Sequence, residues 1–192
     1  MNIEHSNESW LAAVTDTFAS YRRMIDAAVK QLSNEQLRIR LQPGVNSVAV
    51  ILRHLAGNLK SRWTEIFTTD GEKPDRDRDS EFQDWEGDRE SLERYFNEGW
   101  AVLEAMLRGL SHDDFARKVV IRGEAQTLQE ALLRALTHVS YHVGQIMMIA
   151  RTVHEGEWKW LTIAPNESAK HNSETWGTSM SRGIAGDDGE TR

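Results

Sequence analysis

The chain has 192 residues, a length typical of one domain that can bury a core without covalent cross-links. Its formal net charge of −7 and isoelectric point near 5.5 oppose the basic surface expected of a general nucleic-acid binder. The sequence contains no cysteine, so it has neither disulfides nor a nucleophilic thiol of its own. It also has no signal-like amino-terminal segment and no apolar run of roughly 18 residues, so we expect a cytoplasmic protein without a membrane partner.

Four segments carry apolar residues at three- and four-residue steps, as one face of an amphipathic helix requires. The second begins after a Pro-Gly break at an Asn46 or Ser47 cap, and the fourth begins at Thr127, which forms a capping-box pattern with Glu130. The predicted helices span about residues 10–32, 48–67, 89–109 and 128–154. Four such helices in one domain predict an all-α fold, a four-helix bundle whose helices bury their apolar faces together.

The remaining segments connect or follow these helices. The stretch TTDGEKPDRDRDSEFQDWEGD is dense in charge and contains Asp-Gly and Lys-Pro, so it predicts one long loop between the second and third helices. The β-branched run KVVIRG is expected to be extended, but it is too isolated to imply a sheet. We expect the bundle domain to span residues 1–172 and a mobile carboxyl-terminal tail to span residues 173–192.

Two histidines stand on the inward face of the fourth predicted helix. His138 and His142 are four residues apart, so their imidazoles lie about one turn apart on the same side, close enough to share a cation. His142 is in register with the apolar Val139 and Ile146, and burying titratable rings requires compensation. A metal ion is one such compensation, and hydrogen bonding within the core is the other.

His54 supplies a third candidate ligand, from an apolar stretch of the second predicted helix. Three neutral imidazoles would leave coordination positions open, as catalytic sites do, and would suit zinc, nickel or another late first-row ion. Asn58 and Gln145 lie one turn from His54 and His142, so each is a candidate catalytic residue that contacts a substrate or supports a ligand. Ordinary polar bridging between helices explains these two side chains equally well.

The predicted long loop contains three basic residues that are candidates for substrate binding, Lys73, Arg76 and Arg78. Such a loop could close over the mouth of the bundle, where its cations would hold an anionic group of a substrate. The alternative is a loop that is merely solvated, and its composition favours that interpretation.

Three stretches resemble a known family: SVAVILRHLAGNLKSRW with the charged loop after it, LTHVSYHVGQI, and WKWLTIAPNES. They are similar to the DinB-like superfamily and, within it, to the group called DUF1572, from the first predicted helix to about Asn172. The resemblance implies an up-down-down-up four-helix bundle, often dimeric, whose three metal histidines correspond to His54, His138 and His142. The chain departs from the family at LTIAPNES, where relatives more often have a serine and a glycine.

The resemblance implies several reactions, because relatives include thiol-dependent S-transferases, a maleylpyruvate isomerase and proposed hydrolases. Our first hypothesis is a metal-dependent S-transferase, in which the ion ionises an external low-molecular-weight thiol for attack on a small electrophile. The second is a metal-dependent hydrolase, which normally needs a nearby carboxylate, and the sequence offers no clear one beside the three histidines. The third is a non-catalytic metal-binding stress-response protein. The expected partners are a small-molecule substrate and a second copy in a homodimer, without nucleic acid.

Overall fold

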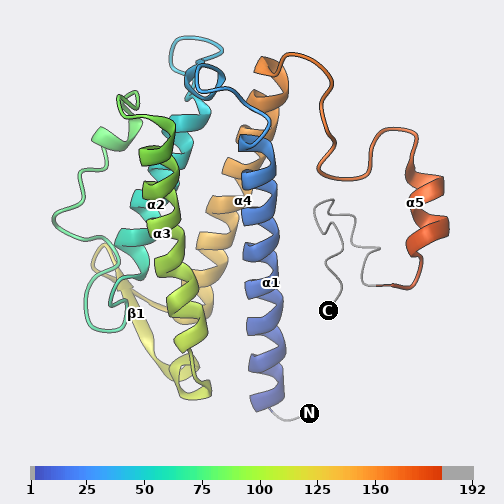
Figure 1. Ribbon diagram of the computed structural model, residues 1–192. Coiled ribbons are helices and arrows are strands. Elements are labelled where there is room, and N and C mark those ends of the chain that lie inside the picture. The colour runs from blue at the N-terminus through green and yellow to red at the C-terminus, as the bar shows by residue number, and fades with distance from the viewer. Residues whose placement is uncertain (1–2, 179–192) are drawn as a thin grey trace.

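The computed structural model describes residues 3–178, and these form five α-helices and one antiparallel pair of short strands. Four long helices run alongside one another, and a short fifth helix stands apart from them (Figure 1). In chain order the elements are α1 Ile3–Val29, α2 Val48–Trp63, α3 Arg89–Gly109, β1 Lys118–Ile121, β2 Glu124–Thr127, α4 Leu128–Val153 and α5 Ser168–Thr175. Short 3-10 helices occupy Gln36–Arg38, Ser80–Phe82 and His112–Ala116. The described chain is therefore mostly helical, as predicted.

The second helix ends earlier than its apolar pattern predicts. Helix α2 ends at Trp63 rather than near Phe67, because Thr64 is extended and Glu65 adopts a left-handed conformation with φ of 47°. Neither backbone conformation continues the helical hydrogen-bond ladder. The long loop between α2 and α3 consequently begins at residue 64.

Residues 118–121 are extended as expected, and they form a sheet that the sequence alone did not imply. Strand β1 pairs with β2 in antiparallel register, with Lys118 opposite Thr127. Arg122 and Gly123 between the strands both have positive φ, 55° and 76°, which produces a two-residue turn matched to the twist of paired strands. The partner strand reads EAQT, and glutamate and alanine are depleted in strands, so composition gave no sign of it.

The core lies between the four long helices and is built from their apolar faces. The indole of Trp100 in α3 is buried and packs edge-on against Phe18 of α1, with ring centroids 6.5 Å apart. Phe96, one turn earlier in α3, lies 5.7 Å from the same indole. The guanidinium of Arg22 in α1 lies 4.9 Å from the centre of the Phe96 ring and closes this cluster toward solvent. These aromatic contacts fix α1 against α3.

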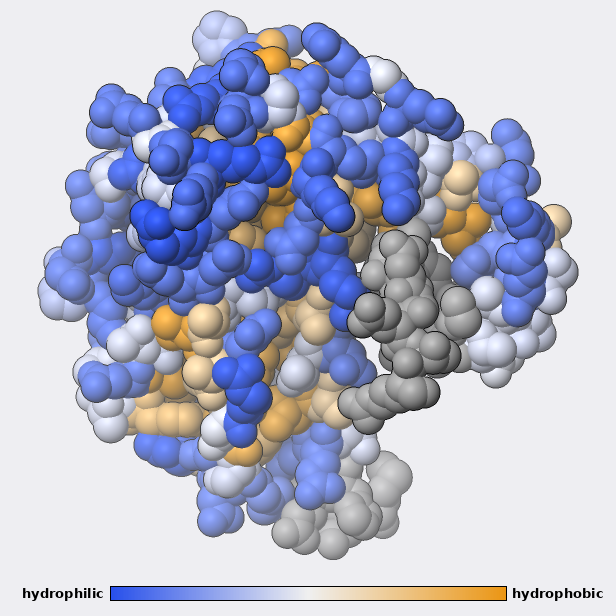
Figure 2. Space-filling model, viewed as in Figure 1, coloured by the Kyte–Doolittle hydropathy of each residue, from blue (hydrophilic) through white to orange (hydrophobic). Residues whose placement is uncertain are grey.

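The long loop folds back onto the rest of the protein. The Asp70 carboxylate accepts hydrogen bonds of 2.8 Å from the backbone N–H groups of Arg122 and Gly123, in the turn between β1 and β2. Farther along, the 3-10 helix Ser80–Phe82 packs against α2. The upper left of the view in Figure 2 is predominantly hydrophilic. The loop is thus anchored on the hairpin, and its inner residues lie against α2.

The chain after α4 leads to α5, beside the four long helices (Figure 1). The predicted domain boundary at residue 172 falls within α5, which ends at Thr175. Residues 179–192 of the predicted tail lie outside the described residues. Within the described range, none of the helices has the length and apolar character needed to cross a membrane.

Helices α2 and α3 approach so closely at Gly99 that a side chain there has no room. A Cβ atom would lie 2.5 Å from the carbonyl oxygen of Ala56. We therefore expect Gly99→Ala to lower the free energy of unfolding by about 1–3 kcal/mol, because one backbone must move away from the other. Gly144→Ala is the matched control: this helical glycine has nothing within 4 Å, and the substitution should raise stability by about 0.5–1 kcal/mol. Urea unfolding measures both changes, and equal stabilities of the two variants would contradict the packing.

Candidate metal centre

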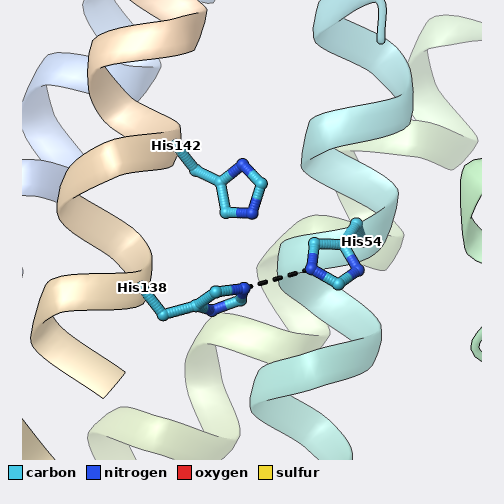
Figure 3. A group of neighbouring side chains, drawn as sticks. All are labelled: His54, His138 and His142. Carbon is cyan, nitrogen blue, oxygen red and sulfur yellow. Dashed lines mark hydrogen bonds between the residues drawn. The ribbon is translucent and has the colours of Figure 1, made fainter. Parts of the chain in front are cut away.

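Three histidines from two facing helices converge inside the fold. His54 projects from α2, and His138 and His142 project toward it from α4 (Figure 3). One nitrogen from each ring lies within 4.8 Å of the others. The Nε2 atoms of His54 and His138 are 3.1 Å apart, and the three ring centroids lie 4.8–5.2 Å from one another. The structure thus brings together the three histidines that the sequence analysis selected.

A buried carboxylate from the long loop orients His54. The Nδ1–H of His54 donates to Oε2 of Glu81 at 2.9 Å, so the lone pair of its Nε2 atom is directed toward His138. Glu81 also accepts two hydrogen bonds of 2.8 Å from Arg76, one on each carboxylate oxygen. A carboxylate in this position fixes the tautomer and the orientation of a ligating histidine and makes the ring more basic.

Glu81 is ionised in this environment. Burial raises the pKa of its carboxyl group, but hydrogen bonds from His54 and Arg76 lower it by more, so the pKa lies below its usual range. The side chain fits against α2 only because residue 57 is glycine: a Cβ atom there would lie 2.1 Å from Oε1 of Glu81. Sequence reasoning missed Glu81 because it is one charge among many in a loop without periodicity. The glycine inside a helical pattern was the one local sign of a close approach.

The other two rings have nitrogens that the protein leaves unpaired. Nδ1 of His142 donates to Oε1 of Gln145 at 2.8 Å, and its Nε2 atom is buried without a hydrogen-bond partner among the described residues. Nδ1 of His138 is likewise buried without a described partner. The ring of Tyr141 lies 4.4 Å from that of His142 and 5.2 Å from that of His138. Buried polar atoms left unpaired cost free energy, so Nε2 of His142, which belongs to the histidine group, calls for a ligand.

Both α4 histidines are neutral at physiological pH. Burial, assisted by the neighbouring His142 and His54, lowers the pKa of His138 to about 3. Burial and His54 lower the pKa of His142 to about 4, against a smaller opposing effect of the hydrogen bond to Gln145. Metal ions bind the neutral form of imidazole, so the rings need no deprotonation before they bind an ion.

The three imidazole nitrogens are a donor set that could hold a metal ion, and one of their separations matches a tetrahedral site. Two nitrogen ligands of a tetrahedral ion, with bonds of about 2.0–2.1 Å, lie about 3.3 Å apart. The separation of 3.1 Å between the Nε2 atoms of His54 and His138 is close to that value. Without an ion, His138 must donate its Nε2 proton to His54, because Glu81 already binds the Nδ1 proton of His54. Nε2 of His142 then has no hydrogen-bond partner among the described residues, and the group could hold a metal ion that this nitrogen binds.

A pocket of about 430 Å³ opens onto His54 and His138. Asn58, one of the two predicted catalytic candidates, lines this pocket. The other, Gln145, does not line it and instead holds the Nδ1 atom of His142. Five arginines line the pocket among the described residues: Arg62, Arg76, Arg78, Arg122 and Arg134. We call it the arginine-lined pocket.

The three basic residues predicted to bind substrate occupy different environments. Arg78 lines the arginine-lined pocket, and its guanidinium lies 4.9 Å from the centre of the Phe82 ring. Arg76 also lines the pocket, but hydrogen bonds engage it with Glu81 and the neighbouring Glu72. Lys73 is not among the lining residues, and its Nζ atom donates to a backbone carbonyl in the same loop at 2.6 Å. Arg62, Arg122 and Arg134 were not predicted, because they come from α2, the hairpin turn and α4.

Fold and site together define a mostly helical protein with a histidine group able to hold a metal ion. The chain belongs to the family described as "Protein of unknown function (DUF1572)", whose model matches residues 5–167. The matched range includes the three histidines and the whole long loop, and it ends directly before α5. The predicted DUF1572 membership is thereby confirmed. No curated protein matches the chain significantly.

Loss of the Glu81 charge should weaken metal binding without removing a ligand. Glu81→Gln keeps the shape of the side chain but loses the carboxylate that makes His54 more basic, so we expect metal affinity to fall by about 10- to 100-fold. Glu72→Gln is the matched control, because Glu72 pairs with arginines and not with a histidine. Competition with a chromophoric chelator measures both affinities. An unchanged affinity in Glu81→Gln, or an equal loss in the two variants, would contradict the orienting role.

The metal-free protein should lose stability as the pH falls from about 6.5. His138 and His142 have pKa values of about 3 and about 4 when folded, against 6.5 when exposed, so between these values the unfolded chain binds more protons. Each such proton lowers the free energy of unfolding by about 1.4 kcal/mol per pH unit. Urea unfolding in the presence of a chelator measures this slope. We expect a smaller slope in His138→Gln and an unchanged slope in His112→Gln, whose histidine is exposed; equal slopes in the two variants would count against burial of a neutral ring.

Proposed function

We propose that the protein is a divalent-metal-dependent enzyme with the four-helix bundle of the DinB-like superfamily, and that it is a thiol-dependent S-transferase acting on small electrophiles. One observation carries the proposal: His54, His138 and His142 meet beneath the arginine-lined pocket with buried nitrogens unpaired. Three neutral imidazoles leave coordination positions free for a reactant, as catalytic sites do. Zinc and nickel are the ions that best suit this nitrogen donor set.

Residues around such an ion would each have a separate role in binding the two reactants. A divalent ion bound there would supply Lewis-acid chemistry, lowering the pKa of a thiol that reaches it. This thiol belongs to a small molecule, because the chain contains no cysteine. Arg78 forms no salt bridge with another described residue and lines the pocket, so it is placed to hold an anionic group of that thiol. Asn58 lines the same pocket and is placed to hydrogen-bond the electrophile.

The transfer itself balances without an oxidant or reductant. The thiol proton passes to solvent, the sulfur forms a bond to an electrophilic carbon, and the leaving group departs with the electron pair of the bond that breaks. His54, held by Glu81, and the two α4 histidines keep the reacting region in place. The Tyr141 ring lies beside both α4 rings and lines the pocket that opens onto His138.

The two other candidate functions have less support. A hydrolase needs a free carboxylate or another proton shuttle near the attacking water. Glu81 contacts the histidine group, but Arg76 binds both of its oxygens and His54 binds one, so it serves as a positioning residue. A non-catalytic metal-binding protein would have no use for a pocket that opens onto two of the ligands. The thiol transferase therefore ranks first.

Metal content and thiol binding test the proposal directly. Mass spectrometry of the purified protein should find about one divalent ion per chain, and His54→Ala and His142→Ala should each lose it, because each removes one of three ligands. His112→Ala, at an exposed histidine, is the control and should retain the ion. The cobalt-substituted protein should change its visible spectrum on addition of bacillithiol, mycothiol, glutathione or coenzyme A, and should transfer that thiol to a generic electrophile.

The outcomes separate the metal from the reaction. Absence of an ion in the wild type, even after reloading, would return all three histidines to core packing. A loaded protein that neither binds nor transfers any of the four thiols would refute the transferase. Turnover of esters or amides without thiol, abolished by chelation, would reverse the ranking in favour of a hydrolase.

A further inference from the structure

The arginine-lined pocket is strongly cationic within an acidic protein. The chain has 30 acidic and 23 basic residues, yet five arginines and no carboxylate lie among the residues that line the pocket. They come from four separate parts of the chain: α2, the long loop, the hairpin turn and α4. Like charges brought together from separate elements repel one another, so their convergence calls for a negatively charged counterpart.

We propose that this pocket binds a small molecule bearing at least two negatively charged groups, carboxylates or phosphates, which Arg62, Arg122 and Arg134 hold. The reactive end of the molecule then faces His54 and His138, and this orientation rests on the function proposed above. The inference names the substrate class of the site and assigns its recognition to arginines outside the group that the sequence selected.

Arg62 gives the sharpest evidence that a ligand is missing from its surroundings. Its side chain is buried, and its Nη1 atom has no hydrogen-bond partner among the described residues. Its contact with Glu72 is long, at 3.8 Å. Burial and the nearby Arg134, Arg76 and Arg122 lower the pKa of Arg62 to about 10, against the effect of Glu72, so it is still charged at neutral pH. A buried, charged and unpaired donor requires an acceptor.

The carboxylates nearby do not neutralise the whole group. Glu72 is shared by three of the lining arginines, at 3.2 Å from Arg76, 3.2 Å from Arg122 and 3.8 Å from Arg62. Arg134 is exposed and forms no salt bridge with another described residue. Among these arginines Glu81 binds Arg76 alone, so Arg62 and Arg122 depend on the shared Glu72, and Arg134 adds a guanidinium without a salt bridge to another described residue. A ligand with a single negative charge would still leave part of the group unpaired.

The dimensions of the pocket select a small molecule. Its volume of about 430 Å³ lies within the range of roughly 300–1,000 Å³ typical of small-molecule sites. The net charge of −7 opposes the approach of a polyanionic macromolecule. His54 and His138 line the pocket together with the arginines, so one compact ligand can reach both. Anionic recognition and the metal-binding group are therefore parts of one site.

Calorimetric titration with simple anions tests the inference. We would titrate the protein as purified, and again after metal removal, with succinate, inorganic phosphate and acetate at matched ionic strength. Succinate or phosphate should bind with a dissociation constant of about 1 mM or lower, and acetate more weakly by about tenfold or more. Saturable succinate binding identifies carboxylates as the recognised groups, and saturable phosphate binding identifies phosphate.

Arginine variants locate the binding. Arg62→Gln and Arg134→Gln should each weaken the bound dianion by about tenfold, because each removes a charge-assisted hydrogen bond. Arg134 is exposed, so its variant keeps the test valid if the buried Arg62 is needed for folding. Arg108→Gln is the matched control: it removes one positive charge from an exposed site on α3 and should leave binding unchanged.

The results distinguish failure of this inference from failure of the proposed function. The inference is overturned if neither dianion binds saturably, or if Arg134→Gln and Arg108→Gln bind it equally well. A normal metal content alongside either result would leave the metal-dependent enzyme standing. Dianion binding that depends on Arg134, in a protein that takes up no ion even after reloading, would support the pocket and refute the proposed metal chemistry.

Discussion

Burying imidazole rings against one another is unfavourable unless every ring nitrogen has a partner, and this constraint shapes the centre of the protein. Glu81 and Gln145 bind the Nδ1 atoms of His54 and His142. The protein supplies no equivalent for Nε2 of His142 or Nδ1 of His138. His54 and His142 are therefore oriented by specific partners, with Nε2 of each ring directed into the histidine group, an arrangement that a cation could complete. A core that only needed to be filled would be more stable with apolar side chains in these positions.

Residues of the long loop hold the histidine group in position. Asp70 ties the loop to the hairpin turn through two backbone N–H groups, and Arg76 farther along holds Glu81 against His54. Gly57 leaves the space in which that carboxylate lies. The hairpin, the loop and α2 are thus connected to His54 through a chain of hydrogen bonds. The loop that sequence composition describes as solvated is part of the site's framework.

The periodicity of apolar residues predicted the helices and the residues on their inward faces, but not the contacts made by the loop and the hairpin. The four long helices and the inward direction of His138 and His142 follow from apolar residues at three- and four-residue steps, which α4 retains over its whole length. Glu81 and the hairpin escaped prediction because their positions depend on contacts between distant segments, such as Asp70 with the turn. Arg134 escaped for a related reason: an exposed arginine on a helix resembles any other until the pocket around it is known. The spacing of apolar residues shows which way the side chains of one helix point. A site depends on how side chains from several elements point relative to one another.

The electrostatics of the pocket link its two proposed ligands. Arg62 and Arg76 contribute to the lowered pKa of His138, so the positive potential of the arginines reaches the histidine group. A divalent ion at the histidines adds to that potential, and a dianion among the arginines reduces it. Binding of either ligand should consequently favour the other, and the coupling free energy is the same whichever binds first. Under the proposed function the pocket would discriminate in favour of substrates that carry negative charge, since a neutral electrophile would leave the ion beside unpaired guanidinium groups.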